Sequence, residues 1–113
     1  MLGRGAGVIL FTGASASVKG YAQSAPFAMG KFALRGLAQS MARELGPKGI
    51  HVAHVVIDGG VRSITHGRVD GAGAPADSLL DPDSIAATYL HVIHQPRSAW
   101  SMEVELRPWV ERF

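Results

Sequence analysis

Phe27-Ala-Met-Gly-Lys31 opens a strongly patterned helix between two apolar runs, and this arrangement decides the fold. Before it, Val8-Ile-Leu-Phe-Thr12 is a continuous apolar run bounded by glycines, which is typical of a strand buried on both faces. After it, Ile50-His-Val-Ala-His-Val-Val-Ile57 is rich in β-branched residues and predicts a second strand. The order strand, helix, strand predicts a right-handed βαβ unit with parallel strands.

The helical pattern extends over residues 26–45. Pro26 suits the first turn, and Gly46-Pro47 ends the pattern. Because Phe27 and Lys31 are four residues apart, the helix places their side chains on one face. Apolar residues recur close to the three-and-four spacing of an amphipathic helix and predict one buried face, formed by Phe27, Leu34, Leu37, Ala38, Met41 and Leu45.

The rest of the chain predicts a long loop, a helix and a third strand. Residues 58–81 are rich in Gly, Pro, Ser, Asp and Ala, and a loop of this length in a compact domain indicates a flexible lid. Asp81-Pro82-Asp83 then predicts a helix start, and Trp100-Ser-Met-Glu-Val-Glu-Leu106 predicts a strand. We therefore predict an α/β fold in one domain spanning residues 1–113.

Composition narrows the class of protein. With 113 residues, of which 47% are hydrophobic and 18% charged, the chain predicts one globular domain. No apolar run approaches the roughly 20 residues of a membrane span, so we expect no membrane partner. The net charge is only +2 and the eleven Lys and Arg residues are scattered, which argues against a nucleic-acid partner. The absence of cysteine excludes disulfides and thiolate metal sites, and with a poor signal peptide it leads us to expect a cytoplasmic protein.

Histidines offer the remaining metal-ligand chemistry. His91 and His94 lie three residues apart with Glu103 nearby in sequence, and these are residue types that bind zinc. Such spacing alone is a weak pattern, so we expect a structural or surface role and no metal site. His51 and His54 alternate to opposite faces of the predicted strand and cannot form a joint site by themselves.

Four passages together resemble one known family. They are Ile9-Leu-Phe-Thr-Gly-Ala-Ser-Ala-Ser-Val-Lys-Gly20, Phe27-Ala-Met-Gly-Lys31, Leu37-Ala-Gln-Ser-Met-Ala-Arg-Glu-Leu45 and Gly49-Ile-His-Val52. In this order they resemble the C-terminal half of short-chain dehydrogenases/reductases. The resemblance implies a partial Rossmann-like, doubly wound parallel sheet from which the N-terminal half is missing.

The family's catalytic residues carry over with substitutions. Its serine position falls on Ala14, with Ser15 as the adjacent hydroxyl, and its tyrosine position is Phe27. A phenyl ring has no proton to exchange, so we expect Phe27 simply to pack. Lys31 is retained, and the resemblance implies that its ammonium contacts the nicotinamide ribose. Tyr21 is the phenol nearest in sequence and offers a substitute proton donor, but its position in a flexible loop favours a packing or surface role.

The resemblance also implies a cofactor. The family's Pro-Gly turn beside the nicotinamide becomes Asp58-Gly59, and Ser63 takes the place of a threonine that contacts the cofactor. Lys31, Gly59 and Ser63 are therefore the expected ligands of NAD or NADP. The upstream units that bind the adenine half have no counterpart here, so we expect little cofactor binding by this chain alone. We also expect either a truncated copy or a reading frame started inside a longer gene.

Two functions follow from the resemblance. The first is an NAD(P)-dependent oxidoreductase acting on small carbonyl or alcohol substrates, with weak or no activity as this chain. The alternative is a non-catalytic interaction module, since the family's helix corresponding to residues 26–45 and its C-terminal elements pack against partner subunits. Small residues at Ala28, Gly36 and Ser40 would permit close helix approach, and we expect a homo-oligomer.

Overall fold

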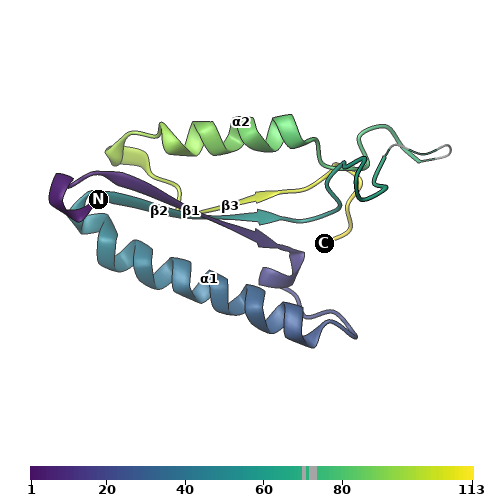
Figure 1. The fold of residues 1–113 in the computed structure, drawn as a ribbon, viewed down its shortest axis with the longest axis horizontal. Coiled ribbons are helices and arrows are strands. Elements are labelled where there is room, and N and C mark those ends of the chain that lie inside the picture. Colours follow the sequence, from purple (N-terminus) through teal and green to yellow (C-terminus); the bar gives the residue numbers. More distant parts are fainter. Residues whose placement is uncertain (70, 72–73) are drawn as a thin grey trace.

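The computed structural model describes residues 1–69, 71 and 74–113. Its strands form one parallel sheet in the order β1-β2-β3. Figure 1 shows α1 covering one face of this sheet and α2 covering the other. The predicted α/β class is therefore confirmed. In chain order the elements are β1 (Gly7–Ala14), α1 (Ala25–Leu45), β2 (Ile50–Ile57), α2 (Pro82–Ile93) and β3 (Glu103–Leu106), with short 3-10 turns between some of them.

Strand β2 is the centre of the molecule and has the predicted bounds. All eight of its residues are buried, because it pairs with β1 on one side and β3 on the other, between the two helices. On the α2 face, Val55 and Ile57 pack with Leu80 and with Tyr89 of α2. A strand covered on both faces needs apolar residues at every position, which explains its continuous β-branched run.

The third strand is shorter than predicted. It begins at Glu103, because the preceding residues make other contacts. The Trp100 indole stacks on the His51 ring at 4.7 Å with an interplanar angle of 2°. The Ser101 amide donates to Oε1 of Gln95 at 2.8 Å. These contacts engage Trp100 and Ser101 before β3 begins.

The predicted buried face of α1 is only partly correct. Ala28 and Ala38 are buried, whereas Leu37 is 49% exposed and Phe27 is 55% exposed. Alanine side chains are small and let the helix backbone approach β2 closely. The first turn of α1, which carries Phe27, begins beyond the carboxyl end of β1 (Figure 1). The expectation that Phe27 packs in the core is therefore wrong for this chain.

The long segment after β2 has no helix or strand among its described residues, as predicted. Its two ends are nevertheless tied together. Val61 forms a bridge with Leu80, and the Leu80 amide donates to the Gly60 carbonyl at 2.8 Å. Part of the predicted lid, residues 70, 72 and 73, lies outside the described residues, so the lid stays a prediction.

A charged link connects α1, β2 and β3. Arg35 donates two hydrogen bonds to the Glu103 carboxylate, at 2.7 and 2.9 Å, and His54 Nδ1 donates to the same carboxylate at 2.9 Å. His54 is completely buried. The hydrogen bond from Arg35 lowers the pKa of Glu103 against the opposing effect of burial, and the bond from His54 adds to the lowering. The pKa of Glu103 therefore lies below its ordinary value of 4.5.

This link predicts a pH-dependent stability. Because the folded state lowers the pKa of Glu103, its contribution is complete above the ordinary value of 4.5 and is lost as the pH falls through the folded value. Glu103→Gln should lower the free energy of unfolding by about 1–2 kcal/mol at neutral pH and flatten its fall below pH 4.5. Urea titrations across acidic pH measure both effects. Glu44→Gln, at an exposed position of α1, is the control; an equal loss in both variants would contradict the prediction.

None of the described helices is both long and apolar enough to cross a membrane.

Candidate functional site

The carboxyl ends of β1 and β2 and the start of α1 surround a cavity of about 340 Å³. In open parallel sheets this edge is where ligands bind. The cavity therefore brings together candidate residues that the sequence separates by up to 45 positions. Its lining includes Ala14, Ser15, Tyr21, Phe27 and Gly59.

Lys31 lies one turn after Phe27 on the same face of α1, as predicted. Its Nζ donates to the carbonyl oxygen of Thr12 at 3.3 Å and lies 5.8 Å from the centre of the Phe27 ring. Phe27 and Lys31 also line a second hollow of about 310 Å³, so the Phe27 ring borders both. The Lys31 ammonium is thus held at the carboxyl end of β1, beside the cavity.

A buried carboxylate connects the ends of all three strands. Asp58, directly after β2, is only 2% exposed. Ser15, directly after β1, donates from Oγ to its Oδ1 at 2.6 Å, and Arg107, directly after β3, donates from Nε to its Oδ2 at 3.2 Å. Arg107 also pairs with Glu105 and lies over the Phe113 ring.

The ionised form of Asp58 is favoured. Burial acts to raise the pKa of its carboxyl, but the hydrogen bonds from Ser15 and Arg107 and the positive charges of Lys19 and Arg107 outweigh burial. The pKa of Asp58 therefore lies below its ordinary value of 3.8. Sequence reasoning treated Asp58 only as the replacement of a proline and missed both partners. The available signal was an acidic residue directly after a wholly apolar strand.

The other expected cofactor ligands have local structural roles. Gly59 has a φ of 143°, and a Cβ there would lie 2.9 Å from Cδ of Pro108, so packing against Pro108 requires glycine at this position. Ser63 Oγ is hydrogen-bonded to Nδ1 of His66 at 3.0 Å and lies outside the residues that line the cavity. Their cofactor roles remain predictions.

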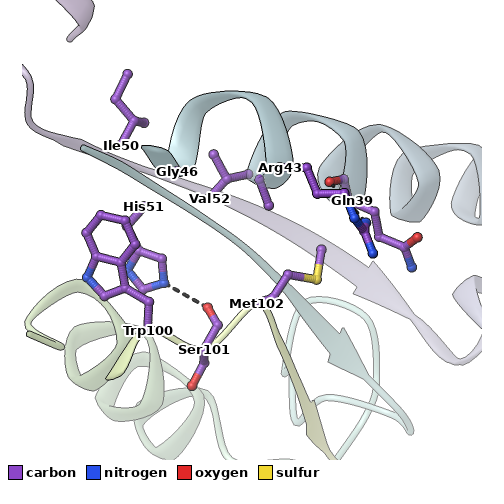
Figure 2. Close-up of a pocket in the computed structure, with 10 residues that line it drawn as sticks. Gln39, Arg43, Gly46, Ile50, His51, Val52, Trp100, Ser101 and Met102 are labelled. Atoms are coloured by element: carbon purple, nitrogen blue, oxygen red, sulfur yellow. Dashed lines mark hydrogen bonds between the residues drawn. The ribbon is translucent and has the colours of Figure 1, made fainter. Parts of the chain in front are cut away.

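Another cavity, of about 480 Å³, lies at the opposite end of the sheet. Figure 2 shows it between α1, with Gln39 and Arg43, and the segment that carries Trp100. His51 contributes to its wall, and His51 Nε2 donates to the Ser101 carbonyl at 2.7 Å (Figure 2). None of the predicted catalytic residues lines this cavity.

The histidines considered for metal binding lie apart from a suitable ligand set. His91 and His94 are exposed on α2, whereas the Glu103 carboxylate is engaged by Arg35 and His54. Within residues 1–69, 71 and 74–113, no cluster of three or more His, Cys, Asp or Glu side chains is arranged to hold a metal ion.

Comparison with known proteins identifies the family of this chain. A sequence model described as short chain dehydrogenase matches residues 1–69, which is more than half of the chain. The chain belongs to the short-chain dehydrogenase family. A solved short-chain dehydrogenase from Rhodopseudomonas palustris is 44% identical to it, with a TM-score of 0.73 and coverage of 96% of this chain and 42% of that chain.

More distant solved structures share the fold of this chain. An alcohol dehydrogenase from the archaeon Thermococcus sibiricus, complexed with 5-hydroxy-NADP, has a TM-score of 0.76 at 22% identity and covers 98% of this chain and 45% of its own. The closed form of a serine dehydrogenase complexed with NADP+ has a TM-score of 0.80 at 19% identity, covering 100% and 48%. The chain thus spans less than half the length of these solved structures. No curated protein matches it.

The groups beside the cavity can be compared with what a nicotinamide dinucleotide requires. The Lys31 ammonium donates to the Thr12 carbonyl and has two further donors that can bond ribose hydroxyls, and the cavity volume falls within the range of small-molecule sites. Within the described residues, the connection from β1 to α1 holds a single glycine, Gly20, and forms no glycine-rich phosphate turn. The described residues thus offer donors for ribose hydroxyls but no phosphate turn.

Proposed function

We propose that this chain supplies the substrate-side half of an NAD(P)-dependent oxidoreductase, with weak or no activity when it acts alone. The observation that carries the proposal is the cavity shared by Ala14, Ser15, Tyr21, Phe27 and Gly59 beside the Lys31 ammonium. The substrate class is a small alcohol or carbonyl compound. When bound, the cofactor would accept or deliver a hydride.

Each residue of the candidate site has a distinct role in this proposal. Lys31 binds the ribose of the cofactor through its ammonium. Ala14 and Phe27 occupy the positions of the family's acid and base and provide apolar walls. Ser15 and Tyr21, two of the hydroxyl groups that line the cavity, can hold a proton of the substrate. Gly59 and Ser63 hold the segment after β2 against the cofactor.

Cofactor binding tests the proposal. The chain is fused to the part of the Rhodopseudomonas palustris short-chain dehydrogenase that the match leaves uncovered, and NADH and NADPH are titrated by fluorescence. Lys31→Ala should weaken binding about tenfold or more, because it removes a charged hydrogen-bond donor. Lys48→Ala, at an exposed position before β2, should leave affinity unchanged. Equal affinities of the two variants would refute the ribose role of Lys31.

An exposed apolar surface on α1 favours a second candidate role, that of a non-catalytic interaction module. Met29, Phe32 and Leu37 are exposed there at 72%, 45% and 49%. Of the small residues expected to contact a partner, Gly36 and Ser40 share this exposure, whereas Ala28 is buried within the chain. We propose that this surface pairs with a second copy. A stable monomeric mass in solution would exclude this role.

A further inference from the structure

We infer that the Ser15–Asp58 pair makes the cavity a receptor for a hydrogen-bond donor, so that it recognises the hydroxyl group of an alcohol in preference to a carbonyl oxygen. The inference deepens the proposed function, on which it rests for the position of the substrate. It departs from the family's pattern, because the family serine has become Ala14 and the hydroxyl next to it is bound to a carboxylate.

The single hydrogen of the Ser15 hydroxyl is already committed. A serine hydroxyl has one hydrogen to donate and two lone pairs that accept. Ser15 Oγ donates to Oδ1 of Asp58 at 2.6 Å, which is the short distance of a hydrogen bond to a charged acceptor. Toward any molecule in the cavity, Ser15 can therefore only accept.

Burial keeps the Ser15 hydrogen in this position. Asp58 is 2% exposed, and its other oxygen accepts from Arg107. Turning the Ser15 hydrogen toward the cavity would deprive Oδ1 of its donor in a place that water barely reaches, and an unsatisfied buried charge is costly. The Asp58 carboxylate thus fixes the direction of the Ser15 hydroxyl.

The rest of the cavity does not reverse this preference. Ala14, Phe27 and Ile57 contribute apolar surface to the lining. Tyr21 and Ser24 carry hydroxyls that can either donate or accept, so they serve an alcohol and a ketone alike. Ser15 alone among these hydroxyls is held as an acceptor, and a ketone oxygen placed beside it would face lone pairs.

Cyclohexanol and cyclohexanone test the inference, because they differ mainly in the hydroxyl donor. Each is titrated into the chain while backbone amide shifts are followed by NMR, which needs no cofactor. The alcohol should bind about fivefold more tightly, the effect of one added hydrogen bond. Asp58→Asn frees the Ser15 hydrogen and should abolish or reverse this preference. Asp83→Asn removes an equal charge at an exposed position of α2 and should leave the preference intact.

Ser15→Ala supplies a second variant that keeps every charge, in case Asp58→Asn fails to fold. It should bring the two affinities to the same value. Equal affinities in the unmodified chain, tighter binding of the ketone, or no binding of either probe up to its solubility limit would each overturn the inference. Failure of the fused protein to bind NADH and NADPH would defeat the proposed function while leaving this preference measurable.

Discussion

Replacing Phe27 by tyrosine together with Ala14 by serine is expected to raise turnover by about 10²–10⁴-fold, the usual contribution of general acid-base catalysis. Both positions line the same cavity, and Nζ of Lys31 lies 5.8 Å from the centre of the Phe27 ring. A tyrosine hydroxyl there would therefore stand near an ammonium, which lowers the pKa of a phenol. A serine at position 14 would add a donor next to it.

The measurement uses the chain fused to the uncovered part of its Rhodopseudomonas palustris relative, with NADPH oxidation followed over a panel of small ketones and aldehydes. Adding Lys31→Ala to the double variant should remove most of the gain, because the phenol then lacks its neighbouring positive charge. A double variant no faster than the unmodified fusion on every carbonyl compound would show that the site lacks more than an acid and a base.

Gly13→Ala is expected to cause a large loss of stability, about 1–3 kcal/mol or more. A Cβ at this position of β1 would lie 2.6 Å from Oγ of Ser17 and 2.8 Å from Cε1 of His54, and closer still to Nε2 of His54. Both neighbours are completely buried. Neither can move freely, because Ser17 Oγ accepts from the Ala14 amide at 3.0 Å and His54 is bonded to Glu103.

Urea unfolding of Gly13→Ala measures this effect as a lower midpoint with an unchanged slope. Gly20→Ala is the matched control, because a Cβ there meets nothing within 4 Å. It should change the free energy of unfolding by less than about 0.5 kcal/mol. If the two variants unfolded at the same urea concentration, the contact between β1 and His54 would have to be looser than described.

The elements that depend on residues close together in the sequence were predicted correctly. Strand β2 has its predicted bounds. A strand buried on both faces is a continuous apolar, β-branched run, and such a run is visible in the sequence itself. The start of α2 was also predictable, because Asp81 accepts a hydrogen bond from the Ser84 amide as an N-cap. Strand β3 was predicted too long, because the stacking of Trp100 on a histidine of another element is invisible in a local pattern.

The candidate site shows the same division. The family pattern brought Ala14, Ser15, Phe27 and Gly59 to attention, and they line one cavity. The exposure of Phe27 was missed, because it depends on where α1 begins relative to the strand ends. Asp58 was missed as a site residue, because a buried charge makes sense only with its partners, and Arg107 lies 49 residues further along the chain.

The hydrogen bonds of the Asp58 carboxylate, which joins the three strand ends, can form only in a fixed order during synthesis. Ser15 emerges from the ribosome first, its acceptor Asp58 follows 43 residues later, and Arg107 comes another 49 residues after that. At about 5–20 residues per second, Arg107 is synthesised roughly 5–18 s after Ser15. During synthesis a nascent chain therefore exposes an incomplete site, and only translation through β3 completes the set of hydrogen bonds on which the orientation of Ser15 depends.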